Sequence, residues 1–166
     1  MSLDFLNSPC KEHLRNKELF GLCDDQDNTR AYSDDANTDK WIARIINKNK
    51  IEVAFTPIDN CIKIFKEGTR EQESTCDGML TSKNCLYLVE LKDQITGGAL
   101  SDATKQLENT MKLLLKNHDL KSFRYKKAFA CNKSHHNFKV IDNEQNLRFF
   151  RTYGFRLDAQ SELKIK

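Results

Sequence analysis

The side chains best placed to do chemistry are Asp77, in the segment 76–80, and Glu90 and Lys92, at the end of the segment 86–92. If 86–92 is a strand, alternate residues share a face, so Glu90 and Lys92 continue a face that begins with leucines. Both faces stay apolar up to Glu90, which is typical of a central strand covered on each side. Burying unpaired charges there costs several kcal/mol each. The pattern therefore indicates that function, rather than folding, explains Glu90 and Lys92.

Asp77 is expected to face Glu90 across a hairpin. The two segments are joined by residues 81–85, and a turn centred between Lys83 and Asn84 brings Asp77 directly opposite Glu90. Opposed side chains have Cβ atoms about 4.5–5.5 Å apart, and two like charges at that separation destabilise the pair. A dication between the carboxylates reverses the sign of this interaction, and Mg²⁺ is usually held by one or two carboxylates with waters and substrate phosphate. The spacing thus predicts a magnesium site.

Asp77, the hairpin spacing, the apolar strand, Glu90-Leu91-Lys92 and the helix and strand that follow together resemble the PD-(D/E)XK nuclease superfamily, over about residues 51–133. Cys76 stands where the family name places proline, at a position that varies widely in the superfamily. The resemblance implies a restriction-endonuclease-like fold in which Asp77, Glu90 and the Leu91 carbonyl ligate Mg²⁺, with Mn²⁺ as a substitute. It also implies that Lys92 orients or activates the attacking water. The expected activity is metal-dependent endonucleolytic hydrolysis of DNA, because a bound metal activates water and neutralises charge on the phosphate.

The same resemblance implies two further site positions. Gln106, near the start of the following helix, matches a position where some members carry an additional active-site glutamine. Many members also use an acidic residue from an early helix or strand, and the candidates here are Glu12, Glu18 and Glu52. Glu52 shares the inferred face of its strand with Ala54, but the residues do not decide among the three.

The same three residues are also compatible with roles outside DNA cleavage. Asp77, Glu90 and Lys92 could form a surface salt bridge at a hairpin edge, worth only ~0–1 kcal/mol, although the apolar run argues against this. A nuclease-like fold could also serve as a non-catalytic binding or inhibitory module, or the enzyme could cut RNA rather than DNA. Because one small domain cannot easily cut both strands of a duplex at once, a homodimer is the expected assembly.

A sheet is needed to position the site, and the chain predicts a mixed central β-sheet flanked by α-helices, in the α/β (α+β) class. Ser8-Pro9 indicates the start of a helix over 9–23, and Trp41, Ile42, Ile45 and Ile46 recur with the spacing of one face of a second helix. The remaining expected elements are a hairpin of strands 51–56 and 61–65, strands 76–80 and 86–91, a long helix after Gly97-Gly98 capped by Ser101, a strand over 123–131, and a helix over 144–153 that ends at Gly154 before a strand-like tail.

Basic and aromatic residues interleave late in the chain, and such a mixture can follow a phosphate backbone and stack on bases, although it also describes a half-buried strand. The basic residues are Lys121, Arg124, Lys126, Lys127, Lys133, Arg148, Arg151 and Arg156, and the aromatic ones are Phe123, Tyr125, Phe149, Phe150 and Tyr153. The loop 132–136 follows the strand expected to lie beside 86–92, so it could touch phosphate or assist a proton transfer, although an ordinary polar loop also fits its residues. The net charge of +3 alone is too small to indicate nucleic acid.

Length and composition exclude several classes. A chain of 166 residues is expected to form one domain, 1–166. No apolar run approaches the ~20 residues of a membrane helix, and no secretory signal is recognisable, so a cytoplasmic protein with six free cysteines is expected. Zinc at Cys131, His135 and His136 would lack a fourth ligand. A calcium loop counted from Asp25 lacks the required Gly and Glu.

Overall fold

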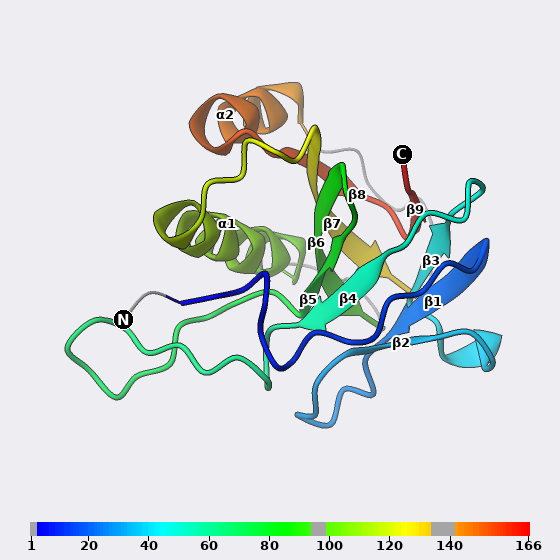
Figure 1. Cartoon of the computed structure of the whole chain (residues 1–166). Helices are drawn as coiled ribbons and strands as arrows, with labels where there is room; N and C mark the ends of the chain where they lie inside the picture. Colours follow the sequence, from blue (N-terminus) through cyan, green and yellow to red (C-terminus); the bar gives the residue numbers. More distant parts are fainter. Residues whose placement is uncertain (1–2, 94–98, 134–141) are drawn as a thin grey trace.

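A computed structural model of the chain describes residues 3–93, 99–133 and 142–166. The described residues form three layers: a pair of α-helices, a central five-stranded sheet and a four-stranded sheet. Figure 1 shows the helices on one side of the central sheet and the smaller sheet on the other. The predicted α+β class, a mixed sheet covered by helices, is confirmed at this level.

The central sheet carries the segments that the site depends on. Its spatial order is β4 (Ala54–Pro57), β5 (Gly78–Thr81), β6 (Cys85–Lys92), β7 (Tyr125–Asn132) and β8 (Arg156–Ala159). The first three strands are antiparallel neighbours, whereas β6, β7 and β8 run parallel. The parallel connections contain α1 (Ala99–Asn117) and α2 (Asn143–Tyr153), which cover one face (Figure 1). The carboxyl ends of β6 and β7 therefore meet at one edge of the sheet.

The smaller sheet covers the opposite face. Its order is β2 (Tyr32–Asp34), β1 (Leu19–Cys23), β3 (Ala43–Ile46) and β9 (Glu162–Lys164), with the short 3-10 helix η1 (Thr38–Lys40) just before β3. Strand β1 is antiparallel to both of its neighbours, and β9 adds to β3 in parallel. The last strand of the chain thus completes a sheet that the first strands begin.

Strand β6 lies between two hydrophobic cores. Leu86 and Leu88 pack with side chains of α1, whereas Tyr87, Val89 and Leu91 pack against the smaller sheet. Every residue of β6 before its last is buried. The central strand predicted from two apolar faces is therefore confirmed. Because side chains alternate along a strand, Glu90 and Lys92 belong to the face of Leu86 and Leu88.

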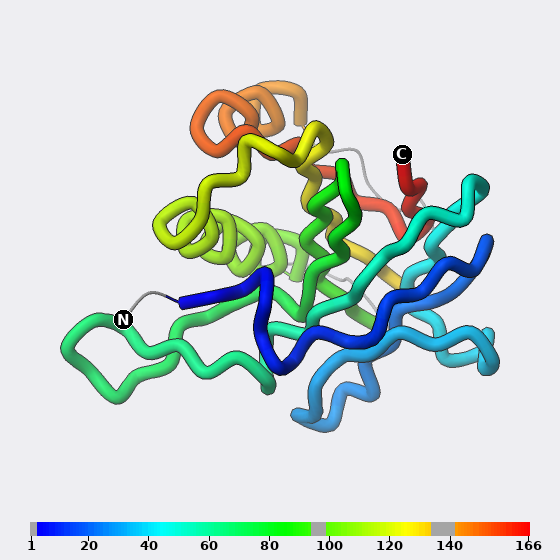
Figure 2. The backbone as a smooth tube through the Cα atoms, viewed as in Figure 1, coloured from blue at the N-terminus to red at the C-terminus, as the bar shows by residue number. Residues whose placement is uncertain are grey.

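The predicted helix over 9–23 is wrong. Residues 19–23 form β1, and the segment before β1 runs along the edge of β4, where Glu12 N donates to Phe55 O and Arg15 N to Val53 O. In Figure 2 this blue segment follows β4 for much of its length. The Ser8-Pro9 signal is only a local preference. It is overridden because the open edge of β4 needs backbone partners.

The predicted helix over 41–46 is also wrong, since Ala43–Ile46 is β3. The spacing of the isoleucines fits either structure, but burial alternates along the segment, and β-branched residues favour strands. Trp41 packs directly over β1: a Cβ on Gly21 would lie 2.0 Å from Trp41 Cγ. A tertiary contact that only glycine permits therefore fixes the approach to β3.

The predicted hairpin between 51–56 and 61–65 is replaced by a long-range pairing. The partner of β4 is β5, with Ala54 opposite Thr81, and 61–65 is not a regular strand. The intervening chain extends away from the sheet before it returns to β5 (Figure 2), and it contains one isolated bridge, between Phe65 and Gln72. The turn signal at 57–60 therefore begins an excursion rather than a tight hairpin.

The other predicted elements agree with the structure. Asp142 caps α2 by accepting from Glu144 N, and Gly154 ends the helix with a φ of 77°. Ser101 lies inside α1 rather than at its cap, and Gly97 and Gly98 fall outside the described residues. Neither of the two described α-helices contains a stretch long and apolar enough to cross a membrane.

The prediction that all six cysteines are free is wrong. Cys10 and Cys61 form a disulfide, with Cα atoms 6.1 Å apart. The disulfide links the segment that runs along β4 to the start of the excursion after β4. Because the two cysteines are 51 positions apart, no local sequence pattern predicts that they pair. Among the described residues, the other four cysteines are free and buried.

Candidate active site

The β5–β6 hairpin has the register that the sequence predicts. Gly78 pairs with Val89 and Thr81 with Leu86, and the turn closes through Ser82 N, which donates to Cys85 O at 2.9 Å. One step beyond the last pair, Asp77 lies opposite Glu90. The hairpin thus brings together two acidic residues from an otherwise apolar pair of strands.

The Asp77 and Glu90 side chains are both buried, with exposed fractions of 9% and 1%. Leu91 N donates to Asp77 Oδ2 at 2.6 Å, which fixes the Asp77 carboxyl against β6. Glu90 Oε2 has no hydrogen-bond partner within the described part of the chain. A buried polar atom left without a partner costs about 1–3 kcal/mol. The chain therefore holds Glu90 in this position at a cost to stability.

Burial raises the pKa of Glu90 well above its usual range, and a side-chain hydrogen bond with Asp77 and the charge of Asp77 raise this pKa further. A hydrogen bond between two carboxyl groups requires a proton on one of them. Asp77 therefore disfavours ionisation of Glu90, and a proton shared by the pair or a cation beside it would relieve the repulsion.

Lys92 ends β6 and is half-buried. Burial and the charge of Asp77 raise the pKa of both Glu90 and Asp59, and the positive charge of Lys92 opposes this rise. The end of this strand is fixed against β7 by Lys133 N, which donates to Lys92 O at 3.0 Å. The ammonium group therefore belongs to the same cluster as the carboxyl pair.

Two further acidic residues that the sequence did not single out join this cluster. Burial raises the pKa of Asp24 to about 6, and Asp77 contributes through its charge and a side-chain hydrogen bond, although the Gln26 amide opposes the rise. Burial, followed by the charge of Asp77, likewise raises the pKa of Asp59. Asp24 directly follows β1 and Asp59 comes shortly after β4, so their positions just beyond strand ends were the available signal.

Gln26 fastens the Asp24 loop to β6. Its backbone takes a left-handed conformation with a φ of 59°. Its N–H donates to Asp24 Oδ1 at 2.8 Å, and its side-chain Nε2 donates to Leu91 O at 3.3 Å. Leu91 O is the carbonyl that the resemblance assigns to the metal. Since a carbonyl oxygen has two lone pairs, the contact with Gln26 leaves one of them free.

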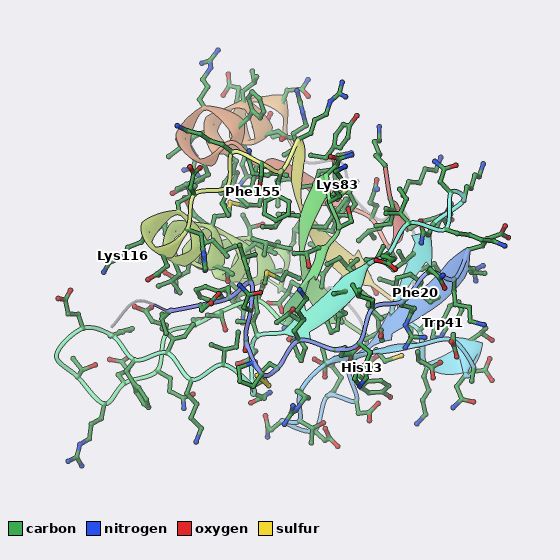
Figure 3. The ribbon with its side chains drawn as sticks, viewed as in Figure 1. His13, Phe20, Trp41, Lys83, Lys116 and Phe155 are labelled. Carbon is green, nitrogen blue, oxygen red and sulfur yellow. A yellow bond between two sulfur atoms is a disulfide. The ribbon has the colours of Figure 1, made fainter. Side chains whose placement is uncertain are left out.

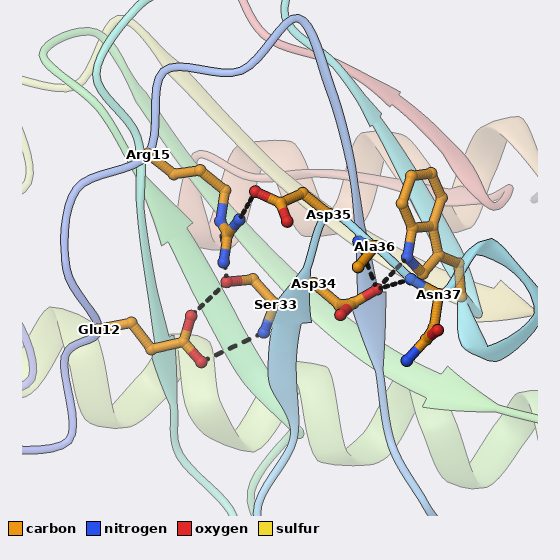
Figure 4. A network of polar contacts seen from close by, with 8 residues as sticks. Glu12, Arg15, Ser33, Asp34, Asp35, Ala36 and Asn37 are labelled. Carbon is orange, nitrogen blue, oxygen red and sulfur yellow. Dashed lines mark hydrogen bonds and ion pairs between the residues drawn. The ribbon is translucent and has the colours of Figure 1, made fainter.

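Glu12, Glu18 and Glu52 lie elsewhere. Glu12 accepts hydrogen bonds from the backbone N–H and the hydroxyl of Ser33, in the network of Figure 4. Glu18 is exposed, 4.0 Å from Lys50 Nζ, and Glu52 is exposed on the rim of an open groove beside Lys83. For Glu12 and Glu18, the reason is that the N-terminal segment, expected to be helical, follows the edge of β4 instead.

Gln106 is half-buried in α1, and its backbone carbonyl accepts from Thr110 Oγ1 at 2.8 Å. Among the described contacts, none joins the Gln106 side chain to Asp77 or Glu90. The predicted role of Gln106 as an active-site residue therefore rests only on its position in α1.

The donor set suits a hard, loosely held cation. No group of three or more His, Cys, Asp or Glu side chains in the described ranges is arranged to hold a metal ion. Mg²⁺, however, is commonly held by one or two carboxylates with waters completing its shell, and Asp77 and Glu90 provide such a pair. Zinc has less support: Cys131 is a buried thiol, and His135 and His136 lie outside the described residues.

Chemically, the cluster offers two opposed carboxylates as oxygen ligands, with an ammonium group at the end of the same strand. Asp24 and Asp59 add negative charge around it and so favour a cation further. Comparisons of the chain with protein-family models, with curated proteins and with solved structures found no match.

Proposed function

We propose that the protein is a magnesium-dependent nuclease that hydrolyses DNA at the cluster of Asp77, Glu90 and Lys92. One observation carries the proposal: two carboxyl groups oppose each other in a buried position, and an oxygen of Glu90 has no partner among the described residues. A hard dication satisfies that oxygen and removes the repulsion. The antiparallel–parallel order of the central sheet supports a restriction-endonuclease-like fold.

Each residue has a defined part in this proposal. Asp77 and Glu90 would hold Mg²⁺, with the free lone pair of Leu91 O beside them. The bound ion would supply an acidic water and neutralise charge on the scissile phosphate. Lys92 would hold the attacking water or a phosphate oxygen through its ammonium group, a point charge that needs no reorganisation during the reaction.

A surface salt bridge accounts for the same residues less well. Exposed ion pairs contribute about 0–1 kcal/mol because water screens both charges, whereas Glu90 is 1% exposed. The ion pairs of the described residues join other side chains, such as Arg15 with Asp35 and Arg148 with Glu108. Burial of an acid without an ionic partner favours a binding role over a packing role.

The test is cleavage of supercoiled plasmid, single-stranded and branched DNA, and RNA, with Mg²⁺, Mn²⁺ or chelator. Wild type is expected to cut DNA with either metal and to be inactive in chelator. Glu90→Gln should be inactive, whereas the exposed Glu52→Gln serves as a matched control and should cut like wild type. Cleavage of RNA alone would redefine the substrate. Failure on every polymer would overturn the enzyme and favour a nuclease-like binding or inhibitory module.

A further inference from the structure

A basic groove of about 340 Å³ lies where β7 approaches β9, on the face of the central sheet away from α1. It is lined by Lys127, Phe129, Gln160, Glu162, Lys164 and Lys166. Three lysines against one glutamate give the groove a net positive charge. We infer that this groove binds the sugar-phosphate backbone of the DNA substrate, an inference that rests on the proposed function and adds a second contact surface to it.

The hydrogen bonds of β9 favour an anion over a peptide strand. β9 pairs only with β3, so its other edge is open within the described sheet. On that edge Gln160 Nε2 already donates to Glu162 O at 3.0 Å, and Tyr87 Oη to Lys164 O at 2.8 Å. An added strand needs both donors and acceptors. Because Glu162 O and Lys164 O already accept hydrogen bonds, the edge is a poorer acceptor for an added strand than it is a donor to phosphate oxygens.

The groove begins next to the strand end that carries the site. Asn132 N donates to Ser161 Oγ at 2.8 Å, and Ser161 Oγ donates to Asn132 O at 2.8 Å, which ties the β8–β9 turn to the end of β7. Asn132 is the register partner of Lys92. From Asn132 back to Lys127 the strand spans about 17 Å at ~3.3 Å per residue. Lys92 and the groove lie on opposite faces of the central sheet, so a DNA strand that contacts both must pass around the edge formed by the carboxyl ends of β6 and β7.

The nearby aromatic residue does not provide a free platform for bases. Lys166 Nζ lies 5.6 Å from the centre of the Tyr125 ring, and Arg124 Cζ lies 5.4 Å from it. Because both cations already use this ring, and Phe129 in the groove is only 1% exposed, the groove offers charge rather than stacking. Phosphate contacts position a nucleic acid without reading its sequence, so binding in the groove is independent of base sequence.

The test compares two charge reversals by fluorescence anisotropy with single-stranded oligonucleotides of two sequences, in chelator, over a range of salt concentrations. Lys127→Glu/Lys164→Glu is expected to weaken binding at least tenfold and to reduce the salt slope by about 1.4, at ~0.7 for each phosphate that a lysine no longer neutralises. Lys112→Glu/Lys116→Glu makes the same charge change on exposed positions of α1, where Figure 3 shows Lys116. This control should bind within twofold of wild type.

The outcomes separate the groove from the nuclease activity. If wild type cuts DNA but the groove variant binds like the control, the groove is refuted and the nuclease stands. If wild type binds through the groove but does not cut, the nuclease fails and the groove stands. Equal competition by polyglutamate, or unequal affinity for the two sequences, overturns sequence-independent phosphate recognition. Lys127→Gln/Lys164→Gln, checked by thermal melting, gives the same answer if the charge reversal does not fold.

Discussion

Replacing Glu90 by Gln should stabilise the protein in the absence of metal, and the gain should grow with pH. Glu90 is 1% exposed, one of its oxygens has no hydrogen-bond partner among the described residues, and Asp77 lies opposite it on β5. An amide has nearly the same shape, cannot ionise and can donate a hydrogen bond to Asp77. The substitution therefore removes the electrostatic cost and keeps the packing.

The magnitude follows from proton linkage. Burial and Asp77 raise the pKa of Glu90 in the folded protein above its ordinary value of 4.5. A folded state that binds more protons than the unfolded chain loses stability as pH rises, by up to ~1.4 kcal/mol per pH unit. The cost of Glu90 is close to zero at pH 4, below its ordinary pKa, and it grows as pH rises toward the raised pKa of the folded state. Each kcal/mol that Glu90→Gln recovers is expected to raise the melting temperature by about 2–4 °C.

The assay is urea unfolding and thermal melting of wild type and Glu90→Gln in chelator at pH 4, 5.5 and 7. Glu108→Gln provides a control for which the expected change in stability has the opposite sign. Burial acts to raise the pKa of Glu108, but hydrogen bonds from Tyr153 and Arg148 outweigh it and lower the pKa. Glu108 therefore contributes stability above the unfolded pKa and loses it as pH falls through the folded one. Its substitution should destabilise at pH 7 and have little effect in acid.

Two results would refute this reasoning. Destabilisation by Glu90→Gln at pH 7 would mean that the ionised carboxylate has a structural partner. A gain of equal size at pH 4 and pH 7 would mean that packing, rather than ionisation, sets the cost of Glu90. Either result also removes the main support for a cation between Asp77 and Glu90.

Three further predictions concern Lys92, the magnesium ion and the disulfide. Lys92→Ala should abolish cleavage, while its DNA affinity measured in chelator stays near wild type. Lys92→Arg should not restore the full rate, because a planar guanidinium does not replace a compact ammonium. Cleavage by Lys92→Ala at the wild-type rate would exclude Lys92 from the reaction. Magnesium at a hundredfold excess over its Kd should stabilise wild type by ~2.7 kcal/mol, measured in thermal melts. The melting temperature of Asp77→Asn should rise little with magnesium. An equal rise in melting temperature for both proteins would place the ion elsewhere. Cys10→Ser should lower the free energy of unfolding by about 4 kcal/mol, as expected for a closed loop of about 50 residues. Reductant should destabilise wild type to the same level. An unchanged urea midpoint for Cys10→Ser would show that the disulfide does not stabilise the fold.

The β5–β6 hairpin could be predicted from the sequence because its information is local. Two apolar faces identify β6 as a central strand, and the short turn around Lys83 and Asn84 fixes the register that opposes Asp77 and Glu90. The end of α2 was predictable for a similar reason, since Gly154 takes a conformation that most residues avoid. Each of these features depends on neighbours within a few residues.

The N-terminal third of the chain was predicted poorly because long-range contacts determine it. The segment around Glu12 and Arg15 is held by backbone hydrogen bonds to β4, and Trp41 is held by its contact with Gly21. Neither partner is close in sequence. The local helix signal at Ser8-Pro9 had no competing local signal, and the isoleucine spacing fits a helix as well as a strand, so both predicted the wrong element.

The full acidic cluster was missed for a related reason, and its composition argues for function. Asp24 and Asp59 come from segments beyond β1 and β4 and meet Asp77 only after both sheets have formed. In each case burial and neighbouring negative charge raise the pKa, so holding these carboxyl groups together costs stability, and Lys92 offsets only part of that cost. Sequences are locally consistent with their folds except where a site demands otherwise. A cation that binds only the folded protein would turn this repulsion into stabilisation, so the cluster fits a binding site better than it fits a part of the core.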